Sequence, residues 1–197
     1  FASFGAASAL ATMAWASNAR GALPVALVLA AGASVATLLF IGTAVRVFSL
    51  HHDLCHGALF STPRKNRTVA TLLGTLVSTS PTVWTREHDR HHRDANNLDR
   101  PQDGETASWT VQQYEQGTRW QRWAYYLVNQ RLVLFGLLPP LYFFVFMRVR
   151  ARWFENALFF AFAAALWDLG VFWLFVVMIV PGSWFGFFTF HAHHTFD

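Results

Sequence analysis

The chain alternates between long apolar runs and short polar stretches. Residues 21–45 carry no charged side chain, and as a helix they are long enough to cross a hydrocarbon core of about 30 Å. Residues 1–17 are also apolar, although rich in Ala and Ser, and the stretch Asn18-Ala19-Arg20-Gly21 separates the two runs. The pattern therefore predicts a transmembrane hairpin over residues 1–45, with Arg20 at its tip.

A second pair of spans is predicted over residues 154–190. We place the turn between them at Asp168-Leu169-Gly170, which leaves a short span before it and a full one after it. A helix over 171–190 would carry the last histidines to the far interface, at 1.5 Å of rise per residue. The other candidate turn, Pro181-Gly182-Ser183, would leave those histidines near the middle of the bilayer.

Three other segments are apolar in part, but we do not expect them to cross. Residues 68–84 follow a basic turn at 63–67 and lie between the first two histidine clusters. These clusters must lie on one side of the membrane if they bind one site. We therefore expect this segment to dip into the membrane and return, or to lie along the interface. Residues 132–147 contain Pro139-Pro140, which break a helix, and are predicted to be re-entrant or interfacial. Residues 109–131 mix aromatic and polar side chains, as an amphipathic helix at the membrane surface does; an ordinary soluble amphipathic helix fits this local pattern equally well.

Composition and charge support a membrane protein. Hydrophobic residues make up 54% of the chain and charged residues 13%, about half the usual charged share. The net charge of +4 does not indicate nucleic-acid binding, because the basic residues flank apolar runs. Arg20 falls on one side and all other Lys and Arg on the histidine side, which the positive-inside rule makes cytoplasmic. We predict an all-α integral membrane protein of about four transmembrane helices in two hairpins, with interfacial or re-entrant helices and a cytoplasmic histidine-rich cap.

The candidate chemistry lies in the histidines. Positions i, i+3 and i+4 share one helix face, so the pattern H-x-x-H-H at residues 88–92 points three imidazoles into one volume. His52 and His56 are also four residues apart, and Asp53 between them could hold an imidazole in place. His51 points about 100° away from His52 on a helix, so we leave it out of the ligand set. We interpret Cys55, the single cysteine, as a small buried side chain. The nine histidines form three clusters: His51, His52 and His56; His88, His91 and His92; and His191, His193 and His194.

This many imidazoles exceeds what one tetrahedral ion needs and suggests two metal ions. Nitrogen ligands at a membrane face suit iron used for O₂ chemistry better than calcium or magnesium, which prefer oxygen. A reduced cytoplasm also suits an iron site that is fed with electrons. No Ser-His-Asp pattern, phosphate loop or dinucleotide fingerprint is evident in the sequence.

At these residues the chain resembles a known family. His52-Asp53-x-x-His56-Gly57 and His88-x-x-His91-His92 are similar to the first two histidine boxes of the membrane fatty acid desaturases. Residues 97–100 and 134–136 resemble stretches of the bacterial acyl-lipid members, and residues 190–197 resemble the cytoplasmic end of the last transmembrane helix. The family carries a further H-x-x-H-H box downstream, which this chain does not contain. We therefore expect residues 1–197 to form one desaturase domain that is incomplete at its C-terminus.

The resemblance implies a function. It implies two iron ions that activate O₂, and two successive hydrogen abstractions that place a double bond in an acyl-lipid or acyl-thioester. It also implies a ferredoxin or cytochrome b5-type electron donor and a bacterial inner membrane. Asp53 and Asp89 are expected to hold imidazoles, and no catalytic residue is expected beyond the metal ligands. Those ligands would be His52, His56, His88, His91, His92 and His194, with His191 a weaker candidate.

Two other classes stay open at this point. Related di-iron membrane oxygenases, such as carotenoid ketolases or hydroxylases and alkane hydroxylases, use similar boxes and differ in their products. A metal transporter or zinc-binding membrane protein is less favoured, because transporters place ligands near the membrane midplane. Here the histidine clusters stand at the ends of apolar runs, beside arginines.

Overall fold

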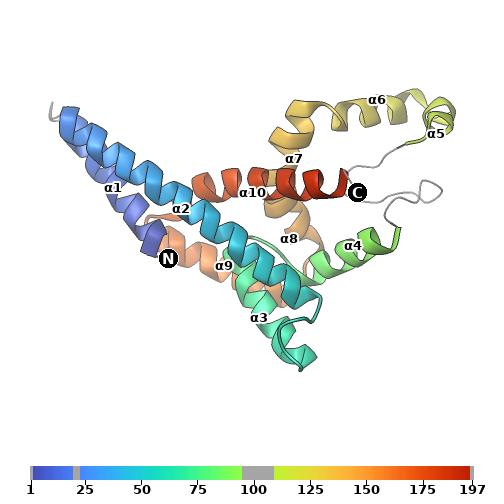
Figure 1. Ribbon diagram of the computed structural model, residues 1–197, viewed down its shortest axis with the longest axis horizontal. Helices are drawn as coiled ribbons and strands as arrows, with labels where there is room; N and C mark the ends of the chain where they lie inside the picture. Colours follow the sequence, from blue (N-terminus) through green and yellow to red (C-terminus); the bar gives the residue numbers. More distant parts are fainter. Residues whose placement is uncertain (1, 20–22, 95–108, 196–197) are drawn as a thin grey trace.

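The computed structural model describes residues 2–19, 23–94 and 109–195, and these ranges contain helices and no strand. For residues 2–4, 17–19, 23, 91, 94 and 189–195 it describes the backbone alone. Helices α1, α2 and α10 are the long ones, and Figure 1 shows α10 crossing beside α2. The elements are α1 (Ala2–Ala19), α2 (Leu23–Cys55), α3 (Pro63–Leu76), α4 (Pro81–Asp94), α5 (Val111–Gln116), α6 (Arg119–Val128), the π-helical η1 (Leu132–Leu137), α7 (Leu138–Leu141), the π-helical η2 (Tyr142–Phe146), α8 (Met147–Arg150), α9 (Trp153–Asp168) and α10 (Phe172–Thr195).

Helices α1 and α2 pack along each other as the expected hairpin (Figure 1). Small residues allow the close approach: Ala7 and Ala36 are buried, and a side chain on Gly32 would meet Leu10. Away from this contact, large apolar side chains of α2 point outward, with Val28 72% exposed. An apolar surface of this kind suits lipid better than water. The predicted tip, Arg20, lies outside the described residues.

Helix α2 continues well beyond its apolar part. Its 33 residues give about 50 Å of length at 1.5 Å per residue, against a hydrocarbon core of about 30 Å. By length and composition, Pro24–Cys55 is a candidate membrane span. The C-terminal turns that follow Arg46 therefore extend past the apolar stretch, and they carry the first histidine cluster.

The prediction that Pro139-Pro140 break the helix is wrong. The chain from Leu132 to Arg150 stays helical, and by length and composition it is the second candidate span. Proline cannot donate a backbone hydrogen bond and crowds the carbonyl four residues earlier. Widened π-helical turns before and after the prolines make room, and the Trp184 indole N–H donates to the freed Gly136 carbonyl at 2.8 Å. A contact from α10 thus stabilises a helix that the local sequence disfavours.

The turn predicted at Asp168-Leu169-Gly170 is confirmed. Helix α9 ends at Asp168, and Gly170 adopts φ +69°, a left-handed conformation that glycine takes without strain. The alternative turn at Pro181 is not used, because α10 runs through that residue. Helices α1, α2, α9 and α10 meet in one apolar cluster that includes Leu166, Phe175 and Met178.

Residues 63–94 form two helices joined by a tight turn, so the mildly apolar segment 68–84 is not one continuous helix. The expected basic turn at 63–67 is instead the first turn of α3, with Pro63 at the start of the helix, where a proline is tolerated. Ser78, at φ 57°, reverses the chain, and the Thr79 N–H donates to the Gly74 carbonyl at 2.7 Å. Gly74 also faces the His51 ring of α2. The turn therefore packs directly against the end of α2.

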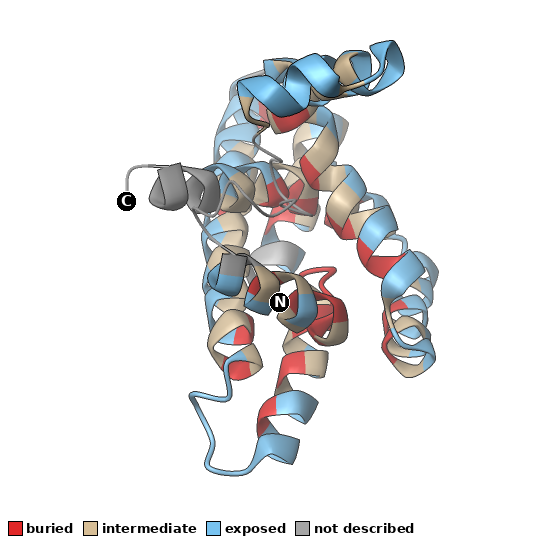
Figure 2. Ribbon diagram, turned by 90° about the vertical axis from the view of Figure 1, so that its right-hand side faces the viewer, coloured by how far each residue is buried: buried red, intermediate tan, exposed pale blue. Residues whose placement is uncertain are grey.

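The single amphipathic helix predicted over 109–131 is two short helices. Thr110 and Thr118 each form a capping box, with Gln113 and Gln121 respectively, so a new helix starts at Arg119. Neither α5 nor α6 buries a residue, and this end of the molecule is mostly coloured as exposed in Figure 2. The capping signals were readable in the sequence as S/T-x-x-Q patterns.

Gly74→Ala is predicted to destabilise the protein. A Cβ at this position would lie 2.5 Å from the Thr79 carbonyl oxygen and 3.0 Å from the His51 ring, and the backbone of a tight turn cannot yield cheaply. Overpacking of this kind costs about 1–3 kcal/mol. Thermal unfolding in detergent measures the loss. Gly42→Ala on exposed α2 is the control, since its Cβ would meet nothing within 4 Å; equal melting of the two variants would contradict the predicted clash.

Candidate metal centre

The end of α2 presents two imidazoles of the first cluster. His56 follows the last helical residue, but its N–H still bonds to the His52 carbonyl at 3.1 Å, so the two side chains keep helical spacing. The His52 Nδ1–H donates to the Asp53 carboxylate at 3.0 Å. This hydrogen bond fixes the proton on Nδ1 and leaves the Nε2 lone pair free to bind a metal.

Helix α4 presents two imidazoles of the second cluster, His88 and His92, on one face. His88 is buried and its ring stacks on Trp84 one turn earlier, at 5.1 Å between centroids and an interplanar angle of 25°. His92 is exposed, one turn further along. The cluster is therefore buried on the side of His88 and open on the side of His92.

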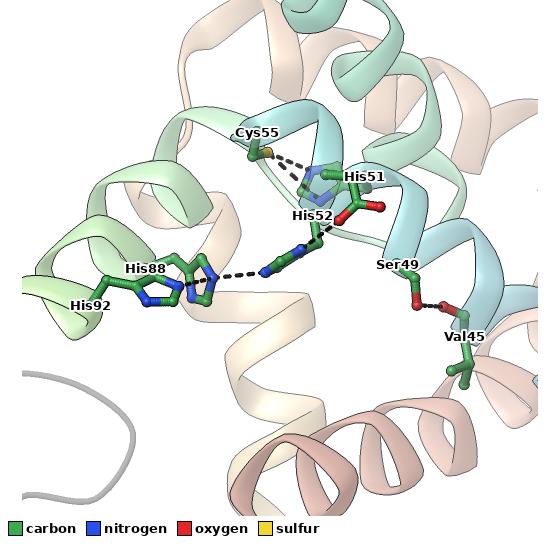
Figure 3. Close-up of polar contacts among 8 residues, drawn as sticks. Val45, Ser49, His51, His52, Cys55, His88 and His92 are labelled. Carbon is green, nitrogen blue, oxygen red and sulfur yellow. Dashed lines mark hydrogen bonds and ion pairs between the residues drawn. The ribbon is translucent and has the colours of Figure 1, made fainter. Parts of the chain in front are cut away.

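The imidazoles from α2 and α4 converge (Figure 3). The His88 Nε2 atom lies 2.8 Å from His52 Nε2 and 3.0 Å from His92 Nε2. One ligand atom from each of His52, His56, His88 and His92 can be chosen so that all lie within 4.8 Å of one another. Four nitrogens around a tetrahedral ion at 2.0–2.1 Å would be about 3.3 Å apart. The described donor set thus has the size and chemistry of a site for a transition metal.

The electrostatics favour the neutral form of one imidazole of the cluster. Burial, and then the positive charges that His52 and His92 carry when protonated, lower the pKa of His56, against the opposing charges of Asp89 and Asp53. A metal ligand must be a neutral imidazole. Because its pKa is lowered, His56 stays neutral, and so able to bind metal, down to a lower pH.

Other candidate residues lie apart from this cluster or outside the described side chains. Asp89 is exposed, and in the described part of the chain it makes no hydrogen bond to an imidazole; it acts on His56 through its charge. Asp53, by contrast, contacts the His52 imidazole directly, and the roles expected of the two carboxylates stay predictions. His91 lies on α4, and the backbone of α10 reaches Thr195, but the side chains of His91, His191, His193 and His194 are outside the description.

His51 lies away from the cluster, as predicted, but it is no surface residue. It is fully buried, stacks near Phe48 and places its Nε2 3.8 Å from the Cys55 sulfur (Figure 3). Cys55 is half-buried beside it, so it is less buried than its interpretation as a small buried side chain implies. Replacing His51 by alanine would leave a void in the core, so this change is unsuitable as a neutral control.

A buried polar network beneath α4 was missed by the sequence reasoning. Glu155 of α9 is 2% exposed, and its carboxylate accepts hydrogen bonds from the hydroxyls of Ser80 and Thr82, at 2.5 and 2.6 Å. Arg148 of α8 donates to the Ser78 carbonyl at 3.3 Å and lies 4.5 Å over the Phe159 ring. The available signal was an isolated acidic residue within the apolar run 153–167. A single carboxylate in such a run needs partners when it is buried.

The chain is similar to known proteins. The sequence profile of the family described as "Fatty acid desaturase" matches residues 24–197. The chain therefore belongs to the fatty acid desaturase family. A "Fatty acid desaturase" of Bacillus subtilis (strain 168) is 31% identical over 109 residues, which are 55% of this chain and 31% of the relative. The match thus spans about a third of that relative's length. No solved structure matches the chain significantly.

His92→Ala is predicted to weaken metal binding while the protein stays folded. The side chain is exposed, so its loss leaves no core cavity, but one nitrogen of the cluster is removed. Loss of a residue that merely orients a ligand already costs about 10–100-fold in affinity, and loss of the ligand should cost at least that. Titration with cobalt(II), followed by its visible absorption, measures the affinity. Arg93→Ala, on the adjacent exposed position, should bind cobalt as the unchanged protein does; equal affinities for all three proteins would exclude His92 as a ligand.

Proposed function

We propose that the protein is an O₂-dependent desaturase that places a double bond in the acyl chain of a lipid or thioester. The observation that carries the proposal is the convergence of His52, His56, His88 and His92 at the end of a long apolar helix. Membership of the fatty acid desaturase family supports the same reaction. We assign the whole range 1–197 to one such domain.

The proposed metal centre contains two iron ions. His52, His56, His88 and His92 would bind metal together with His91 and His194, and His191 is a weaker candidate. Asp53 would keep the His52 ring oriented through its 3.0 Å contact, and Asp89 would act on the cluster by charge. The bound iron would supply O₂ activation and hydrogen abstraction from an unactivated methylene. The protein's own residues orient the imidazoles and hold the acyl chain in an apolar environment.

We propose four membrane spans in two hairpins, α1–α2 and α9–α10, with the histidines on the cytoplasmic face of a bacterial inner membrane. Arg150 of α8 pairs with Glu87 of α4 at 3.2 Å, which supports a position of α8 at the histidine face. On this topology the continuous helix from Leu132 to Arg150 would lie along the interface, because an unbroken helix cannot enter the membrane and return to the same side. Helix α6, with Trp120 79% and Trp123 56% exposed, would lie at the interface.

An external ferredoxin or cytochrome b5-type protein is proposed to supply electrons. The basic residues that gather on the histidine side suit an acidic donor of this kind. Related di-iron oxygenases would give hydroxylated or keto products instead of alkenes.

Expression of the complete reading frame in a host of known lipid composition tests the reaction. New unsaturated fatty acids are expected, and they should require O₂. His91→Ala should abolish them while the protein still inserts, because insertion depends on apolar spans that this change does not touch. Lipid analysis, with bound iron and membrane levels measured in parallel, gives the result. Full product formation by His91→Ala would refute its ligand role, and oxygenated products would move the protein to the related class.

An apolar cavity of about 40 Å³ between α2, η2 and α10 is proposed to receive part of the acyl chain. Phe48 separates it from the imidazoles: its ring meets the edge of Trp84 at 4.8 Å, and Trp84 stacks on His88. Gly182 and Gly186 form part of its α10 side, and a Cβ on either would meet nothing within 4 Å. The lining includes Val45, Phe48, Val77, Phe143, Ile179, Gly182 and Gly186.

Gly186→Leu is predicted to shift the products toward shorter acyl chains. The new side chain can occupy the cavity without a backbone clash, so the space for substrate falls while the fold remains. Fatty acid analysis of cells that express the variant measures the distribution of chain lengths. Gly42→Leu, at an exposed α2 position that does not line the cavity, should leave the distribution unchanged; an unaltered distribution for Gly186→Leu as well would rule out this cavity as the acyl site.

A further inference from the structure

The Glu155 carboxylate, on α9, lies at the first turn of a different helix, α4. Its Oε1 accepts hydrogen bonds from the Thr82 hydroxyl at 2.6 Å and from the Thr82 backbone N–H at 3.3 Å. Its Oε2 accepts from the Ser80 hydroxyl and from the Arg152 N–H, the latter at 3.3 Å. The single carboxylate therefore contacts the starts of both α4 and α9.

Local chemistry explains why a carboxylate fits there. The first N–H groups of a helix have no partner within the helix, and the helix dipole favours negative charge at that end. Ser80 precedes Pro81, the first residue of α4, and its Oγ accepts the Val83 N–H at 3.2 Å while its hydroxyl donates to Glu155. The capping serine and the carboxylate thus form a two-part cap for α4. This cap is made by two segments that lie 75 residues apart in sequence.

The neighbouring helices fix the same corner from a second direction. The Arg148 guanidinium donates to the Ser78 carbonyl, and the Asn156 side chain donates to the Arg148 carbonyl at 2.8 Å. The Ser78 hydroxyl donates to the Phe143 carbonyl at 3.0 Å. Ser78, in the turn before α4, is therefore hydrogen-bonded through its hydroxyl to η2 and through its carbonyl to α8. Glu155 then sets the direction in which α4 starts from this turn.

The direction of α4 decides whether the imidazoles meet. His88 lies two turns from the cap, about 10 Å along the axis, and His92 a turn further. A tilt of a few degrees at the start of α4 moves these rings by about half an ångström, which is the tolerance of a functional site. The partners on α2, His52 and His56, are positioned independently by the end of that helix.

We propose that Glu155 is a positioning residue for the metal centre: it caps α4 from α9 and sets the direction in which that helix presents His88 and His92. This inference rests on the proposed metal-binding function. Glu155 touches neither the imidazoles nor a substrate in its described contacts, so it acts only through the backbone of α4.

The test compares Glu155→Gln with Glu115→Gln, a change of the same chemistry on exposed α5. Hydrogen–deuterium exchange of the metal-free protein in detergent measures how well the cap stabilises α4. Cobalt(II) titration measures the metal affinity of the centre. In Glu155→Gln, peptides from α4 should exchange about fivefold faster, as loss of a helix cap predicts, with α3 unchanged. Cobalt affinity should fall by about 10–100-fold. Glu115→Gln should match the unchanged protein in both measurements.

A rescue separates positioning from general destabilisation. In S80D/E155Q the carboxylate moves to the capping position and the new amide can donate to it, so exchange in α4 and cobalt affinity should both recover. If Glu155→Gln does not fold, Thr82→Val removes one hydroxyl donor and should give a smaller loss of both, with Thr71→Val, whose hydroxyl bonds only to its own helix, as the control. Unchanged exchange in α4, or a loss of affinity that S80D/E155Q does not restore, overturns the proposal. Absence of cobalt binding by the unchanged protein would instead count against the metal centre, because the exchange result does not depend on metal.

Discussion

The packing of Trp84 between α2 and α4 is the contact on which the rest of the site depends. Its ring is 4% exposed, stacks on His88 and meets Phe48 edge to face. The His51 and His52 rings of α2 also lie near it, each 6.4 Å away between centroids. One indole thus borders the polar cluster on one side and the apolar interior on the other. Its burial supplies the apolar contact that brings two helix ends, each rich in polar groups, together.

The surrounding helices supply hydrogen-bond partners for polar groups that this contact buries. Bringing polar helix ends into the interior exposes their unpaired N–H and carbonyl groups to a poorly solvating environment, which is costly. Glu155 and Ser80 satisfy the start of α4, and Arg148 satisfies the Ser78 carbonyl. Trp184 does the same for the carbonyl freed by proline in the 132–150 run. Apart from Ser80, these partners are side chains of other helices rather than local residues.

These features together explain how a membrane-bound helical protein can carry a metal site at its surface. The apolar lengths of α2 and α10 suit lipid, while α2 extends beyond its apolar part far enough to present imidazoles outside it. The buried Trp84 and the partly buried Phe48 separate these imidazoles from the apolar cavity. In the proposed function, this arrangement would let a metal centre and an acyl chain be adjacent without the centre itself being embedded in lipid.

The sequence by itself determined the features that depend on local spacing. The i, i+4 pairs His52/His56 and His88/His92, the turn at Gly170 and the exclusion of His51 follow from helical periodicity and backbone preference, and the histidine boxes were enough to suggest the family. Only the tertiary structure decided that the Pro139-Pro140 run stays helical, that His51 is a core residue and that Glu155 caps α4. Each of these outcomes depends on a partner from a distant helix. A one-dimensional pattern records which groups need partners, but the packing of the helices decides where those partners come from.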